Sequence, residues 1–485
     1  MSTLPILRLG TVKEVERFQA HLQSLGLEIP CDTELQSGAD SPLQMPLKAG
    51  ALTIGNRIAV QPMEGWDGTL DGKPTEHTKE RWKKFGRSGA KLIWGGEAVA
   101  VSHEGRANPN QLVIGEQTKK DLADLRQTLI EEHWRTTGSA DGLVIGLQLT
   151  HSGRYCRPNR HDKPEPKILY HHPILDRKLG LPGDYPVLTD GEIEGIFEQF
   201  HDAAKIAEQL GFDFVDIKHC HGYLGHEFLS AHTREGKFGG TLDNRTRFLR
   251  EIVHAIRLIA PKLAIGVRLS AFDTVPYKPN PAKSAKGKLG PGIPEECAIP
   301  YRWGFGVDSQ NPTREDLTET IQFLVLLEDL KISLVNLTAG SPYYNPHIQR
   351  PALYPPSDGY QPAEDPLISV ARQMNVTRAL KAKFPKLAIV GTAYSYLQDF
   401  LPHVAQAAVR EGWVDAVGMG RMILTYPELL HEASRGRAID HKRICRTFSD
   451  CTTAPRKGLP SGCYPLDPLY KNSEMAARLR IAKAK

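Results

Sequence analysis

Long hydrophobic runs are absent from the 485-residue sequence: no window reaches the eighteen apolar residues that a membrane-spanning helix would need. The N-terminus also lacks the charged-then-apolar order of a signal peptide. The net charge is only +5, and no run of basic residues or interleaving of basic with aromatic residues occurs, so nucleic-acid binding is not indicated. We therefore expect a cytoplasmic protein that has neither a membrane nor nucleic acid as a partner.

Cysteine is scarce as well. The sequence has seven cysteines, which do not make a disulfide scaffold in a chain of this length. Cys445, Cys451 and Cys463 fall close together near the C-terminus. Together with His441 they could in principle hold zinc, but an iron–sulfur cluster normally takes four thiolates. We predict no metal site and do not expect an iron–sulfur cluster.

One unit repeats from about residue 50 onward: a short, β-rich apolar run is followed by a longer stretch with helical apolar spacing. The apolar runs occupy residues 57–62, 91–98, 143–150, 214–220, 263–270, 332–340, 387–393 and 415–421. Eight strands that alternate with helices predict an α/β fold of the (β/α)8 TIM-barrel type. A doubly wound open sheet is the alternative, weakened because no strand is followed by GxGxxG.

The division we predict is an N-terminal extension over residues 1–45, a barrel over 46–435 and a cysteine-containing C-terminal tail over 436–485. Apolar spacing predicts one helix in the extension, over Val12 to Leu25.

Two long insertions follow the fifth and sixth strands, at residues 271–312 and 341–366. Both are rich in Pro and Gly with interleaved aromatic residues, which predicts loops without regular structure. Loops of this length at the active-site face of a barrel are usually functional. We take five aromatic residues as candidate walls of a substrate pocket: Trp66, Tyr301, Trp303, Tyr343 and Tyr344.

The most informative stretch follows the fourth strand, where Lys218, His219, His221 and Tyr223 fall within six residues. Histidines that cap a turn are the alternative interpretation, but four such groups directly after a buried strand favour a catalytic site. His219 should point away from the site if the strand persists, and we treat it as structural.

Residues at the other strand ends should converge on the same cavity. They are Pro62, Met63, Glu64, Glu97, Ala98, Gln148, His151, Arg268, Thr338, Gly391, Gly420 and Arg421. Gly391 with Gly420 and Arg421 indicates a phosphate site in the usual barrel location. Gln148 can bind a heterocycle with donor and acceptor edges, and a buried Arg268 needs a negative or carbonyl-rich partner. FMN would satisfy all three features.

Several segments, in order from about Ser41 to Leu430, resemble the Old Yellow Enzyme family of FMN-dependent NAD(P)H:flavin oxidoreductases. They are SPLQMPLKAGALTIGNRIAVQPM, EAVAVSHEGRANPNQL, GLQLTHSGR, GFDFVDIKHCHGYLGHEFLS, FGGTLDNRTRFLREIV, IGVRLS and VGMGRMILTYPEL. The resemblance implies FMN, with NADH or NADPH as reductant, and a small-molecule substrate. By resemblance, the cofactor is held by Pro62, Met63, Glu64, Ala98, Gln148, Arg268, Gly391, Thr392, Gly420 and Arg421.

The resemblance further implies that His221 grips the substrate's carbonyl and that Tyr223 gives a proton to its α-carbon, so that an activated C=C bond is reduced. Two residues depart from the family pattern. Lys218 stands where most relatives have His, which suggests a more anionic or oxygen-rich substrate, with Lys218 polarising it. Glu64 stands where relatives usually carry Thr or Cys near the flavin; it either faces the flavin or turns away to pair with a nearby cation.

Two other functions stay open at this point. An amine or N-methyl dehydrogenase that passes electrons to a carrier would keep the flavin, although the CxxC start of that branch's cluster motif is absent. A flavin-free lyase or isomerase would use the Gly-Arg site for a phosphorylated substrate. The substrate, the choice between NADH and NADPH and a possible homo-oligomer are not readable from the sequence.

Overall fold

Eight parallel strands close into a barrel in the computed structural model, which describes residues 6–285 and 287–484. The barrel strands are β3 (Ile58–Val60), β4 (Leu92–Ile93), β6 (Val144–Thr150), β7 (Phe214–Ile217), β8 (Ala264–Ser270), β11 (Leu334–Thr338), β12 (Ala388–Gly391) and β13 (Ala416–Met419). Their order is β4-β3-β13-β12-β11-β8-β7-β6, and a β4–β6 pairing closes the ring. The strand β5 (Ala98–Ala100) continues the pairing with β6 beyond β4. The predicted TIM barrel is confirmed.

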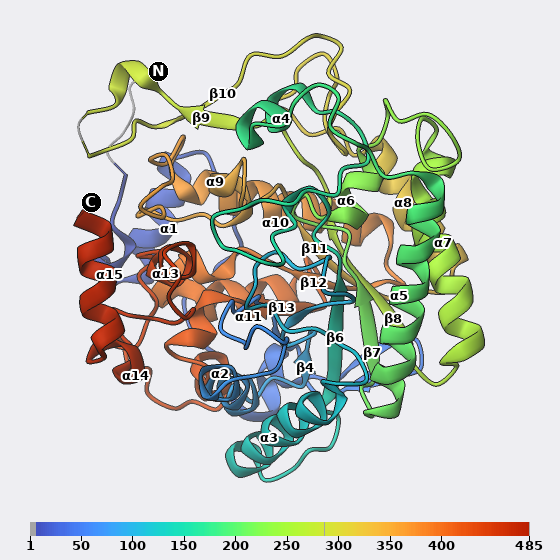
Figure 1. Ribbon diagram of the computed structural model, residues 1–485. Coiled ribbons are helices and arrows are strands. Elements are labelled where there is room, and N and C mark those ends of the chain that lie inside the picture. Colours follow the sequence, from blue (N-terminus) through green and yellow to red (C-terminus); the bar gives the residue numbers. More distant parts are fainter. Residues whose placement is uncertain (1–5, 286, 485) are drawn as a thin grey trace.

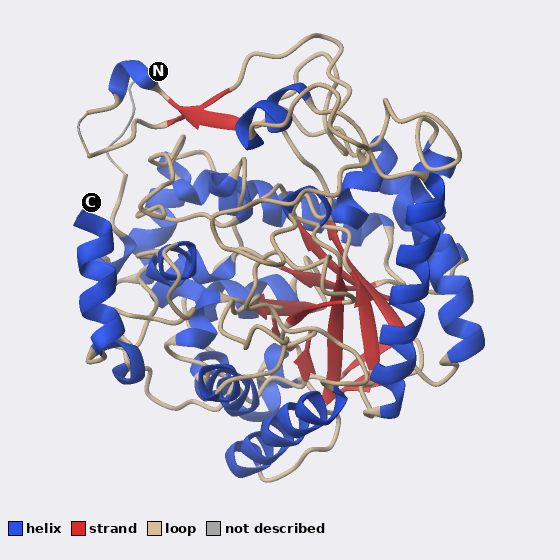
Figure 2. Cartoon of the chain, in the orientation of Figure 1, coloured by secondary structure: helices blue, strands red, loops and turns tan. Residues whose placement is uncertain are grey.

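Helices surround the strands on the outside, as Figures 1 and 2 show. The main ones are α2 (Glu76–Arg87), α3 (Lys119–Thr137), α5 (Asp190–Gln209), α7 (Leu242–Ile259), α8 (Thr318–Asp329), α10 (Pro366–Lys383) and α11 (Leu401–Arg410). Shorter helices are α4 (Pro173–Leu179), α6 (Leu224–Leu229) and α12 (Leu429–Ala433). Side-chain caps by Thr75, Thr189 and Thr241 start α2, α5 and α7, each satisfying a backbone N–H of the first turn. No helix in the described part of the chain is long and apolar enough to cross a membrane.

Large aromatic side chains fill the end of the barrel at which the strands begin. The rings of Trp94 and Phe214 meet edge to face, 5.3 Å apart, and are fully buried. Gly146 makes room for them, because a Cβ there would lie 2.2 Å from the Phe214 ring. The hairpin of β1 (Leu47–Ala49) and β2 (Leu52–Ile54) packs against this cluster. The N-terminal end of the barrel is thereby closed, so a ligand site is left for the C-terminal end.

Both chain extensions pack on the barrel. Helix α1 (Val15–Ser24) buries Phe18, whose ring stacks on Phe400 at 4.3 Å. The tail contains α13 (Asp450–Arg456), α14 (Pro468–Lys471) and α15 (Glu474–Ala484) and is joined to α2 by the Lys84–Asp467 ion pair. In Figure 1 the last helix of the tail, α15 (red), lies at the left edge of the molecule. The boundaries predicted at residues 45 and 435 stay a prediction.

The expectation of two loops without regular elements is wrong in detail. The insertion at 271–312 contains an antiparallel hairpin of β9 (Tyr277–Pro279) and β10 (Gly292–Pro294). The insertion at 341–366 contains the short helix α9 (Pro346–Gln349). Both elements are too short for a periodic signal, so the high Pro and Gly content of these segments concealed them.

Candidate active site at the C-terminal end of the barrel

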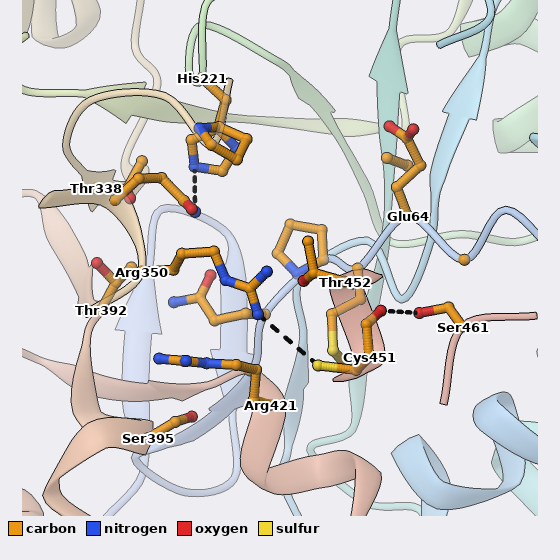
Figure 3. A pocket seen from close by; sticks show the side chains of 18 of the residues that line it. Glu64, His221, Thr338, Arg350, Thr392, Ser395, Arg421, Cys451, Thr452 and Ser461 are labelled. Carbon is orange, nitrogen blue, oxygen red and sulfur yellow. Dashed lines mark hydrogen bonds between the residues drawn. The ribbon is translucent and has the colours of Figure 1, made fainter. Parts of the chain in front are cut away.

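A cavity of about 270 Å³ opens at the C-terminal ends of the strands. Predicted residues that line it are Pro62, Met63, Glu64, Trp66, Ala98, Gln148, Lys218, His221, Tyr223, Arg268, Thr338, Tyr343, Thr392, Gly420 and Arg421. Gly391 does not line it, although the next residue does. In Figure 3, Glu64 and His221 lie on one side of the cavity, and Arg421 and Ser395 on the other. The sequence-based grouping therefore corresponds to one real cavity with two chemically distinct ends.

A buried ionic network holds the segment that follows β3. Arg81 of α2 forms ion pairs with Asp67 and, at 2.6 Å, with Glu97, and all three are nearly inaccessible. Glu97 also accepts a hydrogen bond from the backbone N–H of Gly65 (2.7 Å). Burial, partly offset by Arg81, raises the pKa of Glu97 to about 7. Because breaking a buried ion pair costs several kcal/mol, roughly 3–5, this network fixes the position of Glu64 from behind.

Tyr223 and Lys218, two of the predicted catalytic residues, lie at one end of the cavity. The Tyr223 hydroxyl lies 3.1 Å from Glu64 Oε2 and 2.7 Å from the hydroxyl of Tyr343. The Lys218 ammonium lies 3.7 Å from the centre of the Tyr223 ring and 4.0 Å from Glu64 Oε2. Glu64 thus points into the cavity and pairs with a cation there, which combines the two orientations left open by the sequence.

The ionisation of these groups is strongly perturbed by burial. Burial raises the pKa of Glu64, against the opposing effect of Lys218. It lowers the pKa of Lys218, and burial with the neighbouring Glu64 charge raises the pKa of Tyr223 well above its usual value. Tyr223 is therefore a neutral phenol at neutral pH, as a proton donor must be.

His221 lines the same cavity, on the side of Glu64. Its Nε2 lies 3.2 Å from Gln349 Nε2 of α9, and burial with the nearby Arg268 lowers its pKa well below the usual range, so the ring is neutral. His221 and Trp66 both have a positive φ, an uncommon and strained conformation for residues of this size. His219 faces outward, as predicted: its ring packs between Phe248 and Phe323.

A buried carboxylate organises the wall between the two ends. Asp216 Oδ2 accepts hydrogen bonds from Gln148 Nε2 (2.6 Å) and Trp94 Nε1 (2.7 Å). Asp216 Oδ1 accepts one from the backbone N–H of Arg268 (2.7 Å). Gln148 thus has one amide hydrogen engaged, which orients its carbonyl oxygen. Sequence reasoning missed this role of Asp216, although a carboxylate inside the apolar run FVDI was a visible signal.

Guanidinium groups gather at the opposite end. Arg421 donates to the carbonyl of Pro351 (2.7 Å), and Arg350 donates to the Cys451 sulfur at 3.8 Å. Burial and the charges of Arg421 and Arg456 lower the pKa of Arg350 to about 10. Arg456 pairs with Asp358 at the rim (2.7 Å). Cys451 and Arg456 come from α13, so the C-terminal tail forms part of the cavity, which the sequence did not reveal.

The three C-terminal cysteines do lie together. Cys445, Cys451 and Cys463 line one small cavity beside Arg421. His441 is not with them, since its ring hydrogen-bonds to Asp399 at 2.7 Å. Within residues 6–285 and 287–484, no group of three or more His, Cys, Asp or Glu side chains could hold a metal ion.

Several polar atoms in the main cavity are buried without a partner in the structure. Arg268 Nε, Thr338 Oγ1 and Arg421 Nη1 are in this position. Gly420, at the end of β13, has open space where a Cβ would project. Unsatisfied buried donors are costly, at about 1–3 kcal/mol each. These unpartnered donors and the open space beside the Gly420 backbone fit a heterocycle that carries a phosphate, as FMN does.

Tyr344 does not line this cavity, which corrects its predicted place in the substrate pocket. Its hydroxyl hydrogen-bonds to Asp273 Oδ2 (2.5 Å) in a second, small, buried cavity. Tyr301 and Trp303 line that second cavity as well. The adjacent residues Tyr343 and Tyr344 thus face different cavities.

Comparison with known proteins identifies the family. The model described as the NADH:flavin oxidoreductase / NADH oxidase family matches residues 42–284. An NADPH dehydrogenase of Geobacillus sp. (strain WCH70) is 31% identical over 243 residues, covering 49% of this chain and 65% of the relative. An NADH-dependent flavin oxidoreductase of Aspergillus parasiticus is 30% identical over 219 residues, covering 43% and 46%. The match therefore spans less than two thirds of either relative.

Solved structures show the same fold. A 2-naphthoyl-CoA reductase matches with a TM-score of 0.62 at 20% identity, covering 89% of this chain and 57% of the other. A morphinone reductase in complex with tetrahydroNAD matches with a TM-score of 0.53 at 20% identity, covering 82% and 92%. At this identity the likeness supports the barrel fold alone.

Proposed function

This chain belongs to the NADH:flavin oxidoreductase / NADH oxidase family, and we propose that it binds FMN and reduces an activated C=C bond of a small molecule with electrons from NADH or NADPH. The observation that carries the proposal is the pairing, in one cavity, of a neutral phenol at Tyr223 with unsatisfied donors at Arg268, Thr338 and Arg421. The names of the relatives, NADPH dehydrogenase and flavin oxidoreductase, support it.

The residues that would hold FMN fall into two groups. Gln148, whose side-chain amide is oriented by Asp216, and Arg268, whose backbone N–H donates to Asp216, would bind the polar edge of the ring system. Arg421, with the backbone at Gly420, would bind the phosphate. Bound there, FMN would supply hydride to the substrate's β-carbon.

The chain's own groups would handle the substrate's oxygen and the proton. The Lys218 ammonium and the Nδ1–H of neutral His221, whose Nε2 accepts from Gln349, would donate hydrogen bonds to an oxygen of the substrate and stabilise negative charge on it. The phenol of Tyr223 would protonate the α-carbon. The alternative of a flavin-free lyase is not retained, since it gives Gln148 and Arg268 no role.

Reaction in D2O tests this assignment directly. NADPH or NADH and an α,β-unsaturated ketone, such as 2-cyclohexen-1-one, are given to the purified protein. We expect a saturated ketone with one deuterium at the α-carbon, because the α-proton comes from an exchangeable phenol. Oxidation of NAD(P)H without any reduced ketone would contradict the proposal and favour a different electron acceptor.

A further inference from the structure

The hydroxyl of Tyr223 has one hydrogen and two possible hydrogen-bond partners within the protein. It lies in hydrogen-bond range of Glu64 Oε2 (3.1 Å) and of the Tyr343 hydroxyl (2.7 Å). An ionised carboxylate can only accept. If Glu64 is ionised, Tyr223 must donate to it, and the hydroxyl of Tyr343 donates to Tyr223. In that state the Tyr223 hydrogen points at Glu64 and is not available to a substrate.

A protonated Glu64 reverses the direction of this bond. The carboxylic acid then donates to the Tyr223 oxygen, and the Tyr223 hydrogen is free to turn toward the cavity. Both states keep the same heavy-atom distances, so the protein need not rearrange between them. The choice between the two states depends on where one proton resides.

The surroundings of Glu64 make a proton on it accessible. Its side chain is 11% exposed, and burial raises its pKa. The charged or titratable groups that face it are Lys218 at the end of β7, Tyr223 at the start of α6 and Tyr343 after β11. Trp66 Nε1 donates to its other oxygen at 2.5 Å. The Arg81 network lies behind Gly65 and fixes the backbone.

We propose that Glu64 is a positioning residue that controls the Tyr223 proton: protonated Glu64 orients Tyr223 toward the substrate and reloads it after each turnover. The inference deepens the proposed reduction of a C=C bond and rests on it. Glu64 acts through Tyr223 and does not touch the substrate.

The proton transfers balance as follows. The Tyr223 O–H bond breaks as its proton forms a C–H bond at the α-carbon, whose electron pair comes from the C=C bond after hydride addition at the β-carbon. The Glu64 O–H bond breaks and the Tyr223 O–H bond forms again. Glu64 then takes a proton from water at the cavity mouth. Each turnover thus consumes one hydride equivalent and one proton from solvent, and no further oxidant or reductant is needed.

The first test detects the proton on Glu64 without any cofactor. Infrared spectra of wild type and Glu64→Gln are recorded across pH and subtracted. The difference isolates the carbonyl stretch of protonated Glu64, because the bands of other buried acids, such as Glu97 and Asp273, are present in both proteins and cancel. We expect a band that is lost on raising the pH, with a midpoint above the ordinary glutamate value of ~4.3. The band should shift in a Tyr223→Phe background, because the partner of the carboxyl group is removed.

The second test links that proton to turnover. Wild-type reduction of the ketone should fall as the pH rises through the infrared midpoint, since only the protonated form of Glu64 orients and reloads Tyr223. Glu64→Gln keeps a donor toward Tyr223 but has no transferable proton, so its rate should be about 100-fold lower and flat across this pH range. Glu64→Asp should retain a pH step, and the exposed Glu76→Gln serves as the matched control.

The outcomes separate the two proposals. A band with an ordinary midpoint, or a Glu64→Gln variant that keeps the wild-type rate and pH profile, would overturn the role of Glu64. If the Gln variant does not fold, the pH midpoints of wild type and Glu64→Asp decide the matter in the same way. A protein that shows the infrared band but reduces no ketone would instead contradict the proposed function.

Discussion

The two ends of the main cavity differ in the partners that the protein provides for their charged groups. At the Tyr223 end, the polar groups have partners inside the protein, since Lys218 faces Glu64 and two phenols share hydrogen bonds. At the Arg421 end, within the described residues, Arg350 contacts the Cys451 sulfur and Arg421 the Pro351 carbonyl, and neither has a carboxylate partner. Buried cations without an anion are costly. This contrast fits the proposal that one end moves a proton and the other receives an anion.

This difference explains which substitutions should affect which step. A change at the Arg421 end should act on cofactor affinity, because the ligand itself supplies the missing charge. A change at the Tyr223 end should leave the cofactor bound and act on the reaction with the substrate. The following substitutions test that separation, starting with the largest effect.

Tyr223→Phe removes the proposed proton donor and keeps the ring. We expect bound FMN and reduction by NAD(P)H to be unchanged, while transfer to an unsaturated ketone slows by about 10²- to 10⁴-fold, the usual contribution of a general acid. Stopped-flow absorbance of the two half-reactions measures both rates. An equal loss in both half-reactions would show that the two ends do not act separately.

Arg421→Ala removes the proposed phosphate ligand. A hydrogen bond to a charged group contributes about 1.5–3 kcal/mol, so FMN affinity should fall about 10- to 100-fold. Fluorescence titration of the apoprotein measures it. Riboflavin, which lacks the phosphate, is the control, and its affinity should not change. A comparable loss for both ligands would contradict a phosphate site at Arg421.

Lys218→Ala removes the cation beside Glu64. We expect substrate binding to weaken about tenfold, because a single charge-assisted contact to the substrate is lost, while FMN content stays the same. Steady-state constants for the ketone measure the effect, with the exposed Lys79→Ala as a matched control. Unchanged steady-state constants would show that Lys218 does not contact the substrate.

Tyr344→Phe should have the smallest kinetic effect. The substitution removes the hydrogen bond to Asp273 in the second cavity and leaves a buried carboxylate with fewer donors. We expect a loss of about 1–2 kcal/mol in the free energy of unfolding and unchanged kinetics. Chemical denaturation measures the stability. A raised KM would instead place Tyr344 at the substrate.

The sequence predicted most of the barrel because its signals are local. Strands β6 and β8 are mostly apolar, with Gln148 and Arg268 as exceptions, and α5 and α7 have clear helical spacing with Thr caps. It also grouped Tyr223, Lys218 and Arg421 correctly, since polar residues at the C-terminal ends of barrel strands must converge.

What the sequence could not show depends on distant contacts. Arg350 and Cys451 are about a hundred residues apart, and no pattern indicates that α13 closes the cavity next to α9. The partner of Glu64 was equally hidden, because the contact with Tyr223 joins two loops separated by 159 residues. Tyr343 and Tyr344 are neighbours in the sequence, and only the fold of the insertion places them in different cavities.

The most direct test of the central claim is the visible spectrum of the purified protein, before and after anaerobic addition of NADH or NADPH. The proposed function predicts flavin absorption bands that bleach on addition of the reductant, and FMN in the supernatant after denaturation. A colourless protein that does not take up added FMN would contradict it.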